Sequence, residues 1–590
     1  MGLSKTGYNR FLLVVAGLGG LLYGVDVGII AGALPYLEAT SGFSAGQLSF
    51  VVAAVLLGSV FSTLLAGVLA DWLGRKTLMS LGGLLFVVSI PMIALARGYQ
   101  PLVLGRLLQG ISAGLIGVVV PLYLAECLGA SNRGKGTGVF QGLLSLGIVA
   151  AAAIGLYFSI RVEQVTSLGD ASRLFDFKDR AWRGIFWVSL PPGILFVIGS
   201  FMVAESPRWL FRQGRRAAAR AALLRSCSDA QTAIEFAEME SSAAAEEAQT
   251  AAMGPAVKES LLQRKYVIPF VLACLILACT QLTGVNSVIG YNAAILIQAG
   301  LSDKHAHLGY LLLMCVSFAV TAAAILLVDR KGRKFLLSLG TGGVILSLLG
   351  TAVLFHTTEK QRVDCSQAVQ AMVTPEQKAT IDFNQSMADK LLAAANHPGV
   401  AFAAKPATLV VIYSCGGYLS ASKAVRSDEP PARLEITRES CLPTSQVESF
   451  FKNPFADLNT ARSAPLKIEN ALITPVPGSA NGWLTFACLA CFMAFFSAGP
   501  GVCVWLALSE LMPTRIRSNG MSIALLINQA VSTTIAAIFL PTVGRYGYST
   551  MFFAFAGCTV VYFIIAAFFL PETKGKTLEE IEAHFTKKNL

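Results

Sequence analysis

The chain has 590 residues, of which 54% are hydrophobic and only 14% are charged, and its mean hydropathy is +0.62. This composition excludes an ordinary soluble protein of this length and indicates a chain that lies in a lipid bilayer. The net charge of +11 does not indicate nucleic-acid binding, because the arginines stand at helix ends rather than in a basic patch interleaved with aromatic residues.

Apolar segments long enough to cross a bilayer as helices, about 20 residues each, recur along the chain. Twelve are predicted, at residues 11–34, 48–70, 77–96, 102–126, 138–158, 184–203, 266–298, 308–328, 335–355, 482–509, 519–541 and 549–570. An even number of spans places both termini on one side, where the Lys and Arg residues of the short loops also concentrate. We therefore expect a multi-pass protein of the plasma (inner) membrane with cytoplasmic N- and C-termini. The first apolar segment is too long for the core of a cleavable signal peptide.

Two short charged stretches are written in nearly the same letters, GVLADWLGRK at 67–76 and DRKGRK at 329–334. Each lies between two apolar segments, so the chain reads as two copies of one six-helix unit. Duplicated halves are how many secondary transporters form a substrate site at the repeat interface. The sequence therefore predicts an all-α membrane carrier with two pseudo-symmetric bundles, and not an enzyme.

Two long polar segments set the expected domain boundaries. An N-terminal bundle at 1–203 is followed by a linker at 204–265, whose Ala, Arg and Glu residues predict short helices at the cytoplasmic surface. The C-terminal bundle, 266–590, contains a polar insertion at 357–481 and ends in a cytoplasmic tail at 571–590. The insertion is expected to be a long exofacial loop between the ninth and tenth spans, forming a small accessory module.

The insertion contains three of the twelve cysteines, Cys365, Cys415 and Cys441. An exported segment can hold a disulfide, but three cysteines cannot all pair with one another, so one bridge or none is expected. The other nine lie in or near apolar spans, where packing is favoured over metal ligation. No metal and no cofactor are expected.

Asp26 is the only acidic residue predicted to lie well inside a span. An ionised side chain there costs about 2.5 to 3.5 kcal/mol on insertion scales unless it is paired or protonated. The expected partner is Arg106 in the fourth span, and the cost of burying Asp26 must be offset either by this static ion pair or by a function of the acid. All five histidines fall in loops or at span ends, so none is expected to carry a proton inside the bilayer.

Several motifs together resemble the sugar porter branch of the major facilitator superfamily over nearly the whole chain apart from the two insertions. They are LLYGVDVGIIAG (21–32), GVLADWLGRK (67–76), GRLLQGISAG with PLYLAE and NRGKG (105–136), ESPRWL (205–210), QLTGVN (281–286), DRKGRK (329–334), FFSAGPGVCVWLALSELMPTRIRS (495–518) and PETKGKTLEEIE (571–582). Each motif alone is weak, but their order and their places at span boundaries make the resemblance specific.

The resemblance implies proton-coupled transport. In proton-coupled sugar porters the Asp matching Asp26 exchanges a proton as it engages the Arg matching Arg106, whereas facilitative glucose transporters have a neutral residue there. We therefore expect symport by alternating access, driven by the different proton affinities of two states. A facilitative sugar uniporter and a transporter-like sugar sensor are the alternatives.

Acidic and basic side chains recur at the cytoplasmic ends of the spans. The resemblance implies an ion-pair cluster that latches the cytoplasmic gate in the outward-open state, and the alternative is a set of solvated headgroup anchors. The expected gate residues are Asp71, Arg75, Glu126, Arg133, Glu205, Asp329, Arg333, Glu510 and Arg517.

A sugar site needs uncharged hydrogen-bonding groups and an aromatic face. The residues at the family's hexose-binding positions are Gln141, Gln281, Asn286, Tyr291, Trp505 and Asn528. Departures from the family pattern at Thr280, Gly290, Ser497 and Ile148 put ordinary glucose in doubt. Because the long exofacial insertion is shared with proton myo-inositol cotransporters, inositol is a candidate beside the hexoses.

Other protein classes fit the sequence less well. A sugar sensor typically carries a long cytoplasmic tail, and this chain ends about 20 residues after the last span. A membrane enzyme would need a cluster of catalytic groups, and no HExxH motif, GxSxG motif or pair of intramembrane acids is present. The expected partners are a sugar or polyol substrate, protons and the lipid bilayer, and we expect a monomer.

Overall fold

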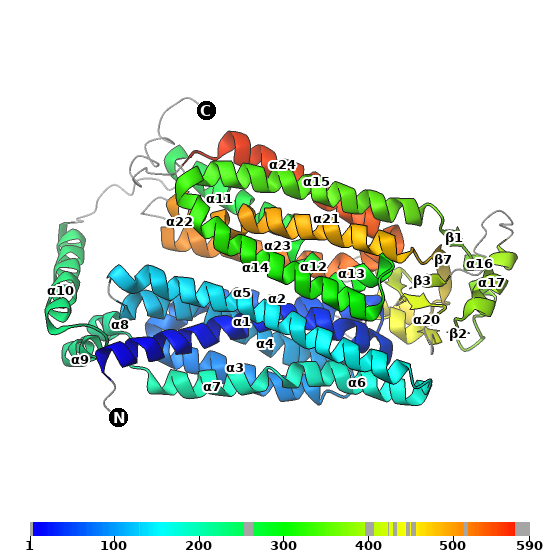
Figure 1. Cartoon of the computed structure of the whole chain (residues 1–590), viewed down its shortest axis with the longest axis horizontal. Helices are drawn as coiled ribbons and strands as arrows, with labels where there is room; N and C mark the ends of the chain where they lie inside the picture. Colours follow the sequence, from blue (N-terminus) through cyan, green and yellow to red (C-terminus); the bar gives the residue numbers. More distant parts are fainter. Residues whose placement is uncertain are drawn as a thin grey trace.

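The computed structural model describes residues 4–128, 130–252, 263–395, 406–422, 424–428, 433–443, 449, 456–511 and 517–572. Within this part of the chain, twelve helical segments are long and apolar enough to cross a membrane, as the sequence predicts. They form two bundles that lie side by side (Figure 1). The predicted all-α membrane fold is confirmed for these bundles.

The N-terminal half contains seven helices that supply the first six spans, with the sixth span divided between the last two helices. They are α1 (Lys5–Ser41), α2 (Ala45–Leu73), α3 (Arg75–Ala94), α4 (Tyr99–Cys127), α5 (Ala130–Thr166), α6 (Ala171–Trp187) and α7 (Leu190–Met202). Three further helices, α8 (Pro207–Arg212), α9 (Arg216–Ser226) and α10 (Asp229–Ala252), follow in the linker and lie at one end of the bundles (Figure 1).

The C-terminal half repeats this arrangement with more broken helices. Its elements are α11 (Arg264–Leu282), α12 (Val285–Gly290), α13 (Asn292–Gln298), α14 (Asp303–Lys331), α15 (Arg333–Glu359), α21 (Ser479–Ala498), α22 (Pro500–Leu511), α23 (Arg517–Tyr546), α24 (Tyr548–Ile564) and the π-helical turn η1 (Ile565–Phe569). The seventh span is interrupted at Gly284, whose φ of +80° favours glycine. A Cβ at this position would also overlap the ring of Phe555.

The segment between α15 and α21 is a small α+β domain with antiparallel strands, so the expectation of a loop is wrong. Its elements are β1 (Val363–Asp364), α16 (Ser366–Gln370), β2 (Lys378–Asp382), α17 (Gln385–Ala394), β3 (Ala407–Cys415), β4 (Tyr418–Ala421), β5 (Val425–Arg426), β6 (Arg433–Thr437), α18 (Arg438–Cys441), α20 (Leu458–Ser463) and β7 (Lys467–Pro475). The first sheet has the order β1-β7-β3-β4 with β5 also paired to β3, and β2 pairs with β6.

This insertion domain has a hydrophobic core separate from the bundle cores. Val369, Ile381, Leu409, Ile436 and Ile473 are among its fully buried members. Their burial supplies the apolar driving force that a solvated loop lacks. The insertion domain lies beyond one end of the bundles (Figure 1), which we call the insertion end. We call the opposite end, which carries the 67–76 and 329–334 motifs, the hinge end.

Close packing between α1 and α5 places the first buried charge. Gly24 faces α5 so closely that a Cβ would overlap the carbonyl oxygen of Leu144. Small residues let transmembrane helices approach in this way. Asp26 lies half a turn further along α1 and is therefore held inside the bundle, with 2% of its surface exposed.

Candidate functional site

Asp26 and Arg106 are both buried in the N-terminal bundle, but they do not form an ion pair within 4.0 Å. The Arg106 guanidinium donates from Nη1 to Gln109 Oε1 at 2.6 Å and from Nε to the carbonyl of Val51 at 3.5 Å. Its charge also interacts with that of Asp26 over a longer distance. Neither carboxylate oxygen of Asp26 has a hydrogen-bond partner among the described residues. A static ion pair is therefore not the arrangement in this conformation.

Gln109 was not among the predicted site residues. It is fully buried one turn after Arg106, and its Nε2 atom has no hydrogen-bond partner among the described residues. The group thus contains a buried acid, a buried guanidinium cation and an amide whose oxygen accepts from that cation. Because an amide both donates and accepts, Gln109 is suited to exchange partners when the helices shift.

Three predicted amides meet in the C-terminal bundle. Gln281 Nε2 donates to Asn528 Oδ1 at 3.1 Å, and Asn286 Nδ2 donates to Gln281 Oε1 at 2.9 Å. Asn286 also donates to Ser532 Oγ at 2.7 Å, a residue that the sequence motifs did not single out. The break at Gly284 brings Asn286 back beside Gln281, because an unbroken helix would carry the two residues to different faces. The result is an uncharged polar cluster between α11, α12 and α23.

The other predicted substrate residues lie elsewhere. Tyr291 is fully buried, donates to the carbonyl of Ala536 at 2.9 Å and stacks on Phe539 with ring centroids 4.6 Å apart. One face of its ring is therefore covered in this conformation. Gln141, on α5, is exposed and takes no part in the amide cluster. The side chain of Trp505 lies outside the described part of the structure.

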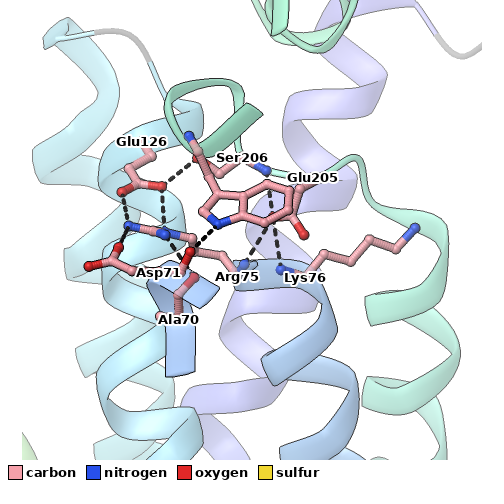
Figure 2. Close-up of polar contacts among 8 residues, drawn as sticks. Ala70, Asp71, Arg75, Lys76, Glu126, Glu205 and Ser206 are labelled. Carbon is pink, nitrogen blue, oxygen red and sulfur yellow. Dashed lines mark hydrogen bonds and ion pairs between the residues drawn. The ribbon is translucent and has the colours of Figure 1, made fainter. Parts of the chain in front are cut away.

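Arg75 is the centre of a cluster at the hinge end (Figure 2). Its guanidinium forms ion pairs at 2.9 Å with Asp71 and with Glu126, and Nη1 donates to the carbonyl of Ala70 at 2.8 Å. The side chain of Arg75 is only 3% exposed. Ser206 also donates its hydroxyl to Glu126. The central cation of this cluster is therefore buried, and its acceptors come from both α2 and α4.

Glu205 uses backbone donors instead of an arginine. Its Oε1 atom accepts from the amides of Arg75 and Lys76 at 3.0 Å and from the amide of Ser206 at 2.8 Å. A carboxylate at the N-terminus of α3 is favourable because the first helical amides have no partners within the helix. The approach requires Gly74, whose φ is +93° and whose Cβ would overlap the Glu205 carboxylate.

The C-terminal half repeats this contact. Glu572 accepts from the amides of Arg333 and Lys334, each at 3.2 Å, at the N-terminus of α15. Gly332 occupies the place of Gly74, with φ of +92°. The two similar motifs thus form the same helix-capping device in both halves. The side chains of Arg133, Asp329, Glu510 and Arg517 lie outside the described part of the structure.

The two halves contact each other toward the insertion end. Asp303 Oδ2, at the start of α14, accepts from Tyr36 OH at 2.9 Å and from Ser159 Oγ at 2.5 Å. Lys304 pairs with Glu163 at 3.0 Å. These contacts join α14 of the C-terminal half to α1 and α5 of the N-terminal half.

The same interface continues deeper into the bundle. His307 is fully buried, stacks on Tyr36 with centroids 5.7 Å apart, and places Nε2 3.3 Å from the carbonyl oxygen of Gly32. Tyr310 donates to the carbonyl of Gly28 at 3.1 Å. His307 lies near the start of α14, as expected of a residue at a span end, but its burial between the halves could not be predicted from its position in the sequence. The halves are therefore held closed at the insertion end.

Comparison with known proteins places the whole chain. The family model described as "Sugar (and other) transporter" matches residues 12–374 and 468–585. The chain is 26% identical to the glucose transporter GlcP of Staphylococcus epidermidis, with 97% of each chain covered. It is 25% identical to the human proton myo-inositol cotransporter, covering 98% of this chain and 82% of the relative.

The fold has matches among solved structures. The xylose transporter XylE from E. coli, in a partially occluded inward open conformation, matches with a TM-score of 0.62 and 18% identity over 96% of this chain and all of that chain. The matched family and relatives are transporters and not enzymes, which confirms the class predicted from the sequence. With twelve candidate spans in two bundles and a family model that covers most of its length, the chain is a multi-pass membrane protein of the sugar (and other) transporter family.

Proposed function

We propose that the protein moves a monosaccharide or polyol across the membrane together with a proton, by alternating access. Relatives named as a glucose transporter and as a proton myo-inositol cotransporter support a sugar-type substrate. The insertion end faces the outside of the plasma (inner) membrane, and the hinge end with both termini faces the cytoplasm. The concentration of Lys and Arg in the hinge-end loops supports this orientation. The transporter works as a monomer.

The proposal of proton coupling is supported mainly by the environment of Asp26. Its buried carboxylate oxygens have no hydrogen-bond partner among the described residues. An ionised carboxylate in such a place is costly, and a protonated one costs much less. A movement that brings Asp26 to Arg106 would favour the ionised form instead. The two conformations then differ in proton affinity, so a proton gradient shifts the balance between them.

The amide cluster supports a neutral polyhydroxylated substrate. Gln281, Asn286 and Asn528 offer donors and acceptors without net charge. The hydrogen bonds that these side chains make with one another can be exchanged for bonds to substrate hydroxyls, which offsets the cost of desolvating the site. Gln141, Tyr291 and Trp505 complete the site when the conformation changes.

In the opposite conformation, the charged side chains at the hinge end form ion pairs between the two halves. In the present structure Arg75 holds Asp71 and Glu126 within the N-terminal half. We assign Arg133, Asp329, Glu510 and Arg517 to the same gate, together with Glu205 and Arg333. Their ion pairs latch the hinge end when the insertion end opens.

Proteoliposomes with an imposed pH gradient test the coupling. Wild-type protein should concentrate the substrate, chosen from a panel of hexoses, pentoses and inositols. Asp26→Asn should abolish accumulation but retain counterflow, because Asn resembles the neutral acid and the loaded carrier still cycles. Asp229→Asn makes the same change at an exposed linker residue and should behave as wild type. If Asp26→Asn accumulates substrate normally, the assignment of the proton carrier is wrong.

A further inference from the structure

A cavity of about 590 Å³ lies between the insertion domain and the helix ends at the insertion end. Tyr36, Lys178 and Lys304 line it from the helices, and Arg426 and Thr474 line it from β5 and β7. Its volume falls within the range of small-molecule sites, about 300 to 1,000 Å³. This cavity is separate from the amide cluster, which none of its lining residues joins.

The walls of the cavity alternate in charge. Lys304 pairs with Glu163 at 3.0 Å, and Arg362 pairs with Glu359 at 3.0 Å. On the opposite wall, Arg426 forms a two-pronged contact with Asp428, at 3.0 Å and 2.9 Å. Paired charges present donors and acceptors side by side with little local net charge. A neutral polyol, whose hydroxyls both donate and accept, matches such walls better than an ion of either sign.

Aromatic rings add an apolar part to the lining of the cavity. Tyr36, Phe355 and Tyr548 line it from α1, α15 and α24. Tyr36 stacks on His307, and Phe355 stacks on both Tyr548 and Phe552. These stacked rings fix the shape of the wall, and the paired charges supply its hydrogen-bonding groups.

The position of the cavity relates it to the transport path. Asp303 and Tyr36 line it and also form the hydrogen bond that joins the two halves. The cavity therefore lies directly beyond the closed insertion end. The family model skips residues 375–467, which include Arg426 and Asp428, so one wall of the cavity comes from a part of the chain that the family model does not describe.

We propose that this cavity is a second binding site, which takes a neutral cyclic polyol of the same class as the transported substrate. The inference rests on the proposed sugar-type function. The insertion domain then acts as one wall of a binding vestibule, and not only as an accessory module. Substrate bound there reaches the central site, which is the amide cluster of Gln281, Asn286 and Asn528, when the hydrogen bonds to Asp303 break.

Binding stoichiometry of the purified full-length protein tests the proposal. Equilibrium dialysis would use radiolabelled myo-inositol, D-glucose and D-xylose. Wild-type protein should bind two equivalents of the preferred ligand. Gln281→Ala/Asn286→Ala should keep only the vestibule equivalent. Arg426→Gln should weaken the vestibule equivalent at least tenfold and leave the central one.

Two further variants complete the test, one as a second probe of the cavity wall and one as a control. Lys178→Gln changes the cavity wall from outside the insertion domain, so it decides the result if Arg426→Gln fails to fold. Lys378→Gln is the matched control, because Lys378 forms a half-exposed pair with Glu435 across β2 and β6 and does not line the cavity. A single equivalent in wild type, or two equivalents unchanged by Arg426→Gln or by Lys178→Gln, would overturn the vestibule. No binding of any tested polyol to wild type would overturn the proposed function as well.

Discussion

The hydrogen bonds that Asp303 accepts from Tyr36 and Ser159 form only while the insertion end is closed, because the donors and the acceptor belong to different halves. The double variant Tyr36→Phe/Ser159→Ala should therefore shift the protein toward the conformation that is open at this end. Tyr36→Phe keeps the ring that stacks on His307. The change is thus limited to two hydroxyl groups.

The structure sets the expected size of the shift. A hydrogen bond to a charged group contributes about 1.5 to 3 kcal/mol. The Asp303 side chain is 29% exposed, so water replaces part of each lost bond. We expect about 2 to 4 kcal/mol for the two bonds together, which changes the ratio of the two conformations by about 30- to 700-fold because 1.4 kcal/mol corresponds to a factor of ten.

The assay is a distance measurement between genetically encoded spin-label amino acids at Gln164, near the end of α5, and His305, in the first turn of α14. Both positions are exposed. The double variant should enlarge the long-distance population. Glu163→Gln is the control, since its pair with Lys304 is about half exposed and such pairs contribute about 0 to 1 kcal/mol. An unchanged distance distribution in the double variant, or an equal shift with Glu163→Gln, would show that the hydrogen bonds to Asp303 do not hold the insertion end closed.

Three further predictions concern other parts of the molecule. Glu126→Gln should destabilise the hinge-end cluster by about 2 to 4 kcal/mol, since it leaves the buried Arg75 with a weaker partner, and a normal thermal unfolding temperature would contradict this. Asn286→Ala should weaken substrate binding by about 1 to 3 kcal/mol by removing a partly buried donor; an unchanged Kd in equilibrium dialysis would contradict its place in the substrate site. A hydrogen bond from Ser414 lowers the pKa of Glu469 in the insertion domain. This stabilisation is present above the unfolded value of about 4.3 and is lost as the pH falls through the lower folded pKa. Ser414→Ala should therefore speed amide exchange in β3 and β7 at neutral pH, with the difference disappearing in acid, and a pH-independent difference would contradict the linkage.

The membrane fold can be predicted from the amino-acid sequence. A bilayer offers no water to the backbone N–H and C=O groups, so these groups must form hydrogen bonds with one another. Twelve apolar segments of about 20 residues satisfy them by forming helices. The repeated charged stretches at 67–76 and 329–334 then identified the duplication, and both begin a helix with the same glycine-and-carboxylate contact. Gln281, Asn286 and Asn528 were also predictable, since uncharged amides inside apolar helices are costly unless they have partners.

Which side chains meet, in contrast, depends on how the helices and strands pack in three dimensions. An Asp26–Arg106 ion pair was expected because the two residues carry opposite charges inside the bilayer. In the structure, however, the Arg106 guanidinium donates to Gln109. Asp303 and His307 lie at the start of a span, where sequence position cannot distinguish a solvated helix end from an interface between halves. The insertion was expected to be a loop because its composition is polar. Its central strand β3 is buried along most of its length and pairs with β7, far along the chain, and such long-range pairing is not visible in the local sequence pattern.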